Sequence, residues 1–295
     1  MKISVIIPNY NHALYLHERI ESVLAQDDED FEVIILDDCS TDNSRDIIEN
    51  YRNHPKVSKI IYNKQNSGCT FQQWNMGVTE TSGDFIWIAE SDDVASKNFL
   101  STARKHIKKN DAVLFFCQSY RIDEDSCITG TWRTQTEDMG SGEIFEQSFT
   151  MEGEMFINTF LIYRNVIPNA SGVVFKKETY LLAGKVDVDI KYNSDWLCWL
   201  KILTLGNIAF CAEPYNYFRF HNKSVISTSG SKELFRKKYD ILMRKRLNKF
   251  LKNYKGLRII NRKIMREEIK NELNFYYQNG FPLKSLKYFF KFYFG

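Results

Sequence analysis

The sequence contains no run of about 18 apolar residues, so it predicts no helix that crosses a membrane. It also lacks a secretory signal at its start, because the apolar stretch Ile3–Ile7 is interrupted at once by Pro8 and Asn9. The six cysteines are scattered without a C-x-x-C pair, which argues against a structural zinc site and favours reduced thiols. These absences predict a cytoplasmic protein.

Two binding motifs are missing as well. The loop after the first predicted strand reads Pro8-Asn9-Tyr10-Asn11, without the G-x-G-x-x-G pattern that usually cradles a dinucleotide pyrophosphate. No recognised nucleic-acid-binding motif accompanies the basic residues, so we expect no nucleic-acid partner. If this chain binds a phosphorylated ligand, the charge of the phosphates must be neutralised in another way.

The charge of the chain is distributed unevenly. Residues 231–295 hold 18 lysines and arginines against five acids, a local charge of +13, whereas residues 1–230 carry −10. We therefore predict a boundary near residue 230 and two parts with different partners. With 43% hydrophobic and 26% charged residues, the chain has the composition of a globular protein.

The first hundred residues predict strands alternating with helices. Apolar runs end at Pro8, Leu36 and Ala89, and between them lie segments with helical spacing such as Leu14–Leu24. This order favours a parallel α/β sheet covered by helices, in which ligands bind at the carboxyl ends of the strands. Three polar groups follow these strands: residues 8–11, Asp37 with Asp38, and residues 90–93.

The stretch from Gly83 to Val94 is the most informative one. An apolar strand ends in Glu90, Asp92 and Asp93, three acids within four positions. One interpretation is a solvated acidic turn. The other is a site for a hard divalent cation such as Mg²⁺ or Mn²⁺, which is often held by one or two carboxylates and the phosphates of a substrate. The two other polar strand ends favour the second interpretation.

An ordered set of motifs over roughly 230 residues resembles the family 2 glycosyltransferases of the GT-A fold, bacterial-type enzymes that build polysaccharides. These motifs are Pro8-Asn9-Tyr10-Asn11, Leu24-Ala25-Gln26, Asp37-Asp38-Cys39-Ser40-Thr41-Asp42, Asn75-Met76-Gly77, Gly83-Asp84 and Ser91-Asp92-Asp93. The resemblance implies a Rossmann-like, mainly parallel sheet flanked by helices over residues 1–230. Residues 1–110 would then be the nucleotide-binding half and residues 111–230 the acceptor-side half.

The resemblance also implies roles for individual residues. Pro8, Asn9, Tyr10 and Asp38 would line the nucleotide pocket, with Asp38 holding the base and Asp92 close to the diphosphate. Asp93, the last acid of the Asp-x-Asp-like element, would bind Mg²⁺ or Mn²⁺. Many members have Asp where this chain has Glu90, so the role of Glu90 is left open.

Two later segments complete the predicted site. Asp195 begins an amphipathic helix, where a carboxylate is favoured by the helix dipole and can serve merely as a cap. The resemblance instead makes Asp195 the catalytic base. Residues 217–225 resemble the Arg-x-His-x-x-Ser element of the family, which makes Arg219 a phosphate contact and His221 a metal ligand or phosphate contact.

Two further segments leave alternatives open. Aromatic residues recur between Glu143 and Arg164, where we expect acceptor-side helices; the rings form either core or a sugar platform. Residues 231–295 predict a basic amphipathic helical extension. This extension binds either an anionic membrane surface, on the inner face of the cell membrane, or protein. In the second case it packs on its own domain or on a homodimer partner.

The sequence thus predicts an inverting, metal-dependent glycosyltransferase. Its donor would be a nucleotide sugar, by family frequency a UDP-sugar, and its acceptor a glycan or lipid-linked hydroxyl in the synthesis of a surface polysaccharide such as capsule or lipopolysaccharide. One alternative is an inactive nucleotide-sugar-binding partner in a polysaccharide assembly complex. The other is a sugar nucleotidylyltransferase, which would release pyrophosphate from a nucleoside triphosphate.

Overall fold

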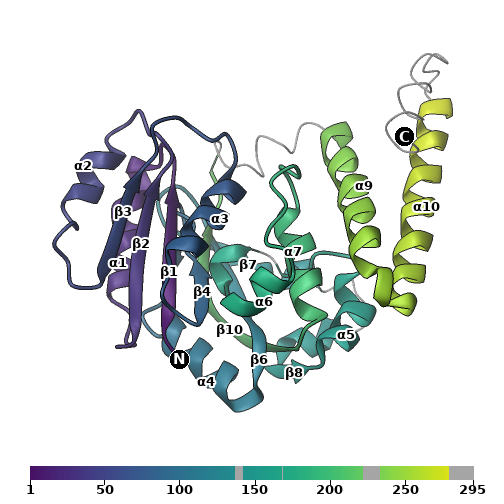
Figure 1. Cartoon of the computed structure of the whole chain (residues 1–295), viewed down its shortest axis with the longest axis horizontal. Helices are drawn as coiled ribbons and strands as arrows, with labels where there is room; N and C mark the ends of the chain where they lie inside the picture. Colours follow the sequence, from purple (N-terminus) through teal and green to yellow (C-terminus); the bar gives the residue numbers. More distant parts are fainter. Residues whose placement is uncertain (137–141, 168, 222–232, 279–295) are drawn as a thin grey trace. The chain divides into compact units, whose positions relative to one another are not determined.

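A computed structural model describes residues 1–136, 142–167, 169–221 and 233–278. The chain divides into two compact units, Met1–Thr228 and Ser229–Gly295. In the first unit, strands and helices alternate as the sequence predicts (Figure 1). The first elements are β1 (Ile3–Asn9), α1 (Ala13–Leu24), β2 (Phe31–Asp37), α2 (Ser44–Glu49), β3 (Val57–Tyr62), α3 (Thr70–Glu80), β4 (Phe85–Ile88), β5 (Val94–Ala95) and α4 (Phe99–Asn110).

The later elements of this unit are shorter and more varied. They include one π-helical turn, η3, and several 3₁₀ turns. In order they are β6 (Ala112–Ile122), β7 (Ile128–Thr131), η1 (Trp132–Gln135), η2 (Gly142–Glu146), β8 (Phe149–Met151), α5 (Gly153–Phe156), η3 (Ile157–Leu161), η4 (Ala170–Gly172), β9 (Val173–Lys176), α6 (Lys177–Leu182), α7 (Ser194–Leu203) and β10 (Asn207–Arg219).

The strands form one mixed sheet in the order β3-β2-β1-β4-β9-β6-β10-β5, with β7 beside β6 and β8 beside β10. Strands β3, β2, β1 and β4 are parallel, and β6 is parallel to β10. Strand β9 runs antiparallel to both of its neighbours, β4 and β6. The expected parallel arrangement is therefore present among β1–β4 and in the pair of β6 and β10. Strands β5, β7 and β8 run antiparallel to their partners, and antiparallel β9 joins the two halves.

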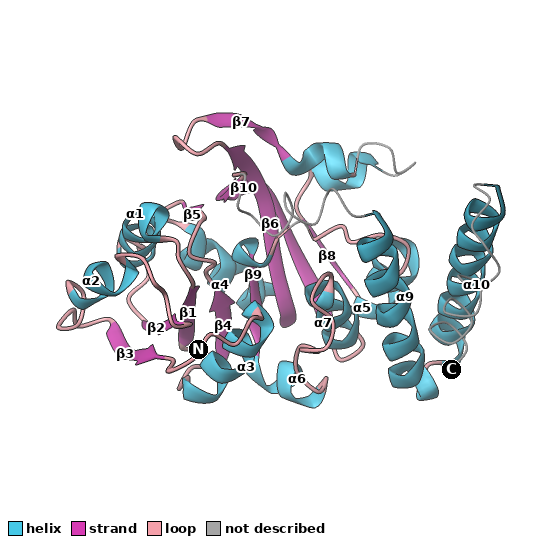
Figure 2. Cartoon of the chain, turned by 90° about the horizontal axis from the view of Figure 1, so that it is seen from above, coloured by secondary structure: helices cyan, strands magenta, loops and turns pink. Residues whose placement is uncertain are grey.

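Helices cover both faces of this sheet (Figure 2). On one face, apolar residues of α1, α2 and α4 pack against β1, β2 and β4 in a single buried core. On the other face, α3 lies so close to the sheet that a Cβ on Gly77 would come within 2.6 Å of the Ile6 side chain. Gly77 is one of the residues that carry the family resemblance, and close helix–sheet packing explains why a glycine fits there.

Three of the aromatic residues between Glu143 and Arg164 belong to the core, whereas Tyr163 is 52% exposed. Phe145, Phe156 and Phe160 are buried and contact one another and Phe210 of β10. The core alternative of the sequence analysis is therefore confirmed for these rings, which are not a sugar platform.

The second unit contains α9 (Glu233–Phe250), the short turn η5 (Leu251–Asn253) and α10 (Lys255–Gln278). The two helices pack against each other, and Ile241, Leu247 and Ile269 are among their buried residues. Buried Arg244 forms an ion pair with Glu268, joining α9 to α10. The last part of the predicted basic extension, residues 279–295, lies outside the described residues. Within the described part of the chain, no helix has the length and hydropathy needed to span a membrane.

Candidate active site

The carboxyl ends of β1, β2 and β4 meet as the α/β pattern predicts. The Asn9 side chain donates to Asp37 Oδ1 at 3.1 Å, and the Asp38 backbone N–H donates to the Asn9 carbonyl at 2.9 Å. The Ala89 N–H, just after β4, donates to the Ile6 carbonyl of β1. The three polar groups found in the sequence therefore lie on one rim of the sheet.

The predicted nucleotide-pocket residues differ in their exposure. Pro8 and Asn9 are buried, whereas Tyr10 is 45% exposed. The carboxylate of buried Asp38 accepts hydrogen bonds of 2.6–3.0 Å from Asn63, Ser67 and Gln73. In this structure, therefore, protein groups already use both oxygens that were predicted to hold the nucleotide base.

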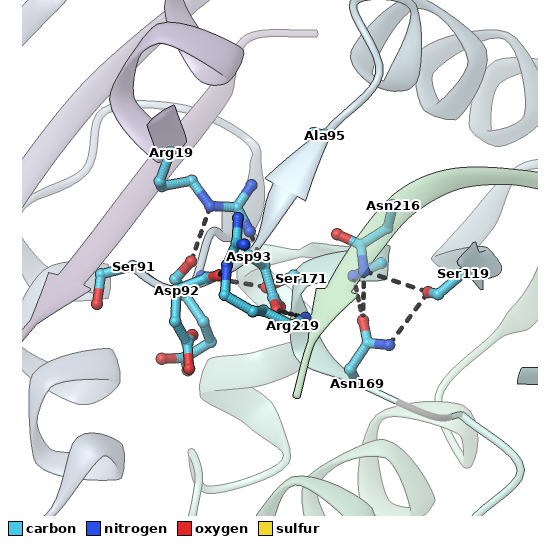
Figure 3. A network of polar contacts seen from close by, with 12 residues as sticks. Arg19, Ser91, Asp92, Asp93, Ala95, Ser119, Asn169, Ser171, Asn216 and Arg219 are labelled. Carbon is cyan, nitrogen blue, oxygen red and sulfur yellow. Dashed lines mark hydrogen bonds and ion pairs between the residues drawn. The ribbon is translucent and has the colours of Figure 1, made fainter. Parts of the chain in front are cut away.

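Asp93 faces into the protein. One of its oxygens accepts the Arg219 backbone N–H at 2.9 Å, and the other lies 3.9 Å from the guanidinium of buried Arg19. Figure 3 shows Asp93 among Arg19, Ser171 and Arg219. Burial, together with the charge of Asp92, raises the pKa of Asp93 to about 7.

Asp92 is directed elsewhere, towards two imidazoles. Its Oδ2 lies 3.0 Å from Nε2 of His221, which is 3% exposed. Ligand atoms of His12, Asp92 and His221 all lie within 4.8 Å of one another. Burial alone would raise the pKa of Asp92, but the hydrogen bond with His221 and the charges of His12 and His221 outweigh it and lower the pKa.

Glu90, whose role the sequence left open, lies at the same strand end. Its carboxylate accepts the Trp74 indole N–H at 2.8 Å, and its carbonyl accepts Arg19 Nε at 2.7 Å. Burial and the negative charges of Asp92 and Asp93 together raise the pKa of Glu90 to about 8, which Trp74 and Arg19 only partly offset. The three acids thus have three different environments.

Arg219 connects several elements at the rim. All three of its guanidinium nitrogens donate to protein oxygens: the carbonyls of Asp92, Asp123 and Glu124, the Ser126 hydroxyl and the Glu18 carboxylate. The guanidinium also lies 4.7 Å from the centroid of the Tyr15 ring. Arg219 therefore holds β10, the β6–β7 hairpin and α1 together; its contact with a phosphate stays a prediction.

Asp195 lies in the first turn of α7, as expected for a residue near the positive end of a helix dipole. Its helix is fixed by Trp196, whose indole N–H donates to the Leu161 carbonyl at 2.7 Å. The Trp199 ring lies 6.0 Å from Trp74, the residue that holds Glu90, so α7 is connected to the acidic strand end. Burial raises the pKa of Asp195 above its ordinary value.

Sequence reasoning missed three residues of this site. His12 lies in the loop just after β1, and its imidazole belongs to the group around Asp92. Arg19 faces Asp93 from α1. Ser171 lies in η4, the short turn before β9. The Ser171 carbonyl accepts the Trp87 indole N–H, and its hydroxyl accepts the Glu90 N–H. The position of His12 just after a strand's carboxyl end was the one signal that could have identified it.

The chain is similar to proteins of one known family. The sequence model of the family described as Glycosyl transferase family 2 matches residues 4–167. An uncharacterized glycosyltransferase of Nostoc sp., alr2836, is 40% identical over 243 residues, which cover 79% of this chain and 70% of that protein. Glycosyltransferase GlyG of Streptococcus pneumoniae is 34% identical over 122 residues, so this match spans only 40% of GlyG.

Two solved structures share the fold. Residues 1–349 of Staphylococcus aureus TarS, in complex with UDP-GlcNAc, superpose with a TM-score of 0.70 at 22% identity, covering 96% of this chain and 76% of that one. The mannosyltransferase PcManGT of Pyrobaculum calidifontis, in complex with GDP-Man and Mn²⁺, gives 0.59 at 14% identity and covers 92% and 75%. Since the family model covers more than half of the chain and a relative is 40% identical over most of its length, the chain belongs to glycosyl transferase family 2, the family of glycosyltransferases that its motifs resemble.

Proposed function

We propose that this chain transfers a sugar, with inversion, from a nucleotide-sugar donor to a hydroxyl of a glycan or lipid-linked acceptor in surface polysaccharide synthesis. The observation that carries the proposal is the Asp92–His221 pair at the carboxyl end of β4, on the rim predicted to bind the donor. A UDP-sugar is the donor we propose, supported by the fold shared with TarS, whose structure contains UDP-GlcNAc.

We further propose that Asp92 and His221 hold a divalent cation. A carboxylate oxygen and an imidazole nitrogen are suitable ligands for Mn²⁺, the ion present in the PcManGT structure. Asp92 is favoured over Asp93 as the ligand because the oxygens of Asp93 already face Arg19 and Arg219. When bound, the cation supplies Lewis-acid stabilisation of charge on the leaving diphosphate.

Residues of this chain would accept the proton of the acceptor and position the two substrates. Asp195, fixed at the start of α7, would accept the proton of the attacking acceptor hydroxyl. The protein around Asp92 and the helix that carries Asp195 would hold donor and acceptor in line, which lowers the entropic part of the barrier. Asp93, Arg19 and Ser171 would keep the strand end rigid while Asp92 faces the ligand.

The test is the melting temperature of the full chain with UDP, GDP, dTDP or CDP, each with and without Mn²⁺. A ligand that binds only the folded state raises the melting temperature, so a metal-dependent rise with one nucleotide supports the proposal. The absence of any rise contradicts it. Binding without sugar transfer would instead indicate an inactive partner, and release of pyrophosphate from a nucleoside triphosphate a nucleotidylyltransferase.

We also propose that the second unit attaches the protein to an anionic membrane surface. Helix α10 carries a row of exposed side chains at helical spacing: Ile259, Arg262, Lys263 and Arg266. An apolar side chain among cations is typical of helices that lie on anionic lipid. This supports a membrane over a purely polar partner such as nucleic acid.

A further inference from the structure

His12 lies outside every motif that carries the family resemblance. It stands in the loop after β1, and its carbonyl accepts the N–H groups of Tyr15 and Leu16 at 2.9 Å, which begins α1. Its ring nevertheless lies against that of His221, with the centroids 5.5 Å apart and the planes nearly perpendicular. Only the backbone carbonyl of His12 takes part in beginning the helix, so this role does not explain the imidazole side chain.

We propose that His12 is a third protein ligand of the cation held by Asp92 and His221, so that this chain has a two-histidine, one-aspartate site. The inference rests on the proposed function, which requires a cation at Asp92. It is carried by the grouping of the three ligand atoms within 4.8 Å. Carboxylate and imidazole groups that converge in this way from three separate segments form a typical transition-metal ligand set.

The His12 ring is held in place by a neighbour. Its Nδ1 lies 2.8 Å from the hydroxyl of Ser91, the residue before Asp92. Metal-binding histidines almost always engage their second ring nitrogen in this way, which fixes the ring orientation and the tautomer. Ser91 is buried, so its hydroxyl is itself well positioned.

The backbone around His12 is equally fixed. Asn11 has the left-handed conformation, with φ of 55°, and its side chain accepts the Thr41 N–H at 2.7 Å. The Asn11 N–H donates to the Ser40 hydroxyl, and the Ala13 N–H donates to Asp42. The loop after β2 therefore clamps the residues on both sides of His12, and the imidazole is presented from a rigid support.

The opposite imidazole is rigid too. His221 packs against the Tyr15 ring with centroids 5.1 Å apart, and Tyr15 lies under the Arg219 guanidinium. Two fixed nitrogen ligands select among cations, because Mg²⁺ strongly prefers oxygen ligands, whereas Mn²⁺ and later divalent metals accept imidazole. The site should therefore bind Mn²⁺ more tightly than Mg²⁺.

The experiment titrates Mn²⁺ and Mg²⁺ into the full chain, with and without UDP, and measures metal binding by calorimetry and by the electron paramagnetic resonance of free Mn²⁺. For His12→Ala we expect Mn²⁺ affinity to fall by at least about tenfold, the lower end of what even an outer-shell partner contributes. Mg²⁺ affinity should change much less, so the preference for Mn²⁺ should shrink.

His17→Ala is the matched control. His17 lies on α1, the helix that follows His12, but its ring contacts Tyr51, away from the cluster. This variant should bind Mn²⁺ as the unchanged chain does. If His12→Ala does not fold, His12→Gln gives the same reading, because an amide side chain can still bond to Ser91 but has no imidazole nitrogen.

Asp92→Asn separates this inference from the proposed function. If Asp92→Asn loses Mn²⁺ while His12→Ala and His12→Gln bind it normally, His12 is not a ligand and the proposed function stands. If the unchanged chain binds no Mn²⁺ even with UDP, both proposals are overturned. A loss of Mn²⁺ affinity in His12→Ala, with His17→Ala unaffected, supports the third ligand.

Discussion

At the scale of the residue, two adjacent aspartates have different environments. Asp93 points inward to Arg19 and Arg219, and Asp92 points towards His12 and His221. Burial and the charge of Asp92 raise the pKa of Asp93 although Arg19 opposes the rise, whereas His221 and His12 lower the pKa of Asp92 despite its burial. Residue type alone does not separate the two, since the direction of each side chain depends on partners that are far away in sequence.

The role of Asp195 can be tested by removing its charge. Asp195→Asn should lower the turnover of sugar transfer by about 10²- to 10⁴-fold, the usual contribution of a general base, while the affinity for the donor stays the same. Steady-state rates and a donor-binding titration measure both quantities. Glu178→Gln, an exposed acid on α6, is the control and should leave both unchanged. Turnover near normal in Asp195→Asn would exclude the base.

The pH dependence of turnover offers a second check on Asp195. Because burial raises its pKa, the carboxylate takes up a proton at a higher pH than an exposed aspartate does. The base form is present above that pKa and is lost below it. The rate should therefore fall on the acid side at a pH above the usual range of aspartate. Mn²⁺ binding measured over the same pH range is the control, and an acid limb that follows metal loss would argue against Asp195.

At the scale of the element, Arg219 at the end of β10 connects parts of the chain more than ninety residues apart. Its side chain bonds to the loop after β4, to the β6–β7 hairpin and to Glu18 of α1. The sheet edge is thus tied to the helix that covers it. Such a buried, multiply bonded cation serves the architecture because removing it leaves several acceptors without a donor.

Replacing this cation should cost considerable stability. Arg219→Met should lower the free energy of unfolding by about 1–3 kcal/mol, because the carbonyls of Asp92 and Asp123 then lose their donor. Arg52→Met is the control, because Arg52 forms an exposed ion pair with Glu49 and should cost about 1 kcal/mol or less. Urea unfolding of both variants measures the difference, and equal losses would show that Arg219 has no special structural role.

Much of the first half of the fold could be predicted from the sequence. The buried strands up to β4 and the helices between them follow from apolar runs and helical spacing, and they place Asn9, Asp38 and Asp92 on one rim. The reversed direction of β9 and its place between β4 and β6 could not be predicted, because these partners lie about 90 and 60 residues earlier in the chain. The directions of Asp92 and Asp93 and the grouping with His12 depend on those same long-range contacts.

At the scale of the whole molecule, charge separates the two units. Residues 231–295 carry +13 against −10 for the rest of the chain. Helices α9 and α10 confirm that the start of this region is helical, as the spacing of its apolar residues predicts. Its binding to a membrane stays a prediction, which substitutions in the exposed row on α10 can test.

The membrane proposal can be tested by reversing charge on this row. A variant with Arg262→Glu, Lys263→Glu and Arg266→Glu should bind less to vesicles of anionic lipid, because each basic residue near such a surface contributes about 1 kcal/mol. Co-sedimentation at several fractions of anionic lipid measures the effect. The control reverses Lys105, Lys108 and Lys109, three exposed lysines of α4. Equal binding of both variants, or a change in oligomeric state alone, would favour a protein partner.

The place of β9 in the chain has a consequence for folding. During synthesis, β4 and β6 leave the ribosome well before residues 173–176, yet β9 must lie between them to complete the sheet. Contacts of such long sequence separation form slowly, and until then two apolar strands keep an unpaired edge. A nascent or truncated chain that ends before Val173 should therefore be prone to aggregation and depend on chaperones, even though its first four strands could already pair.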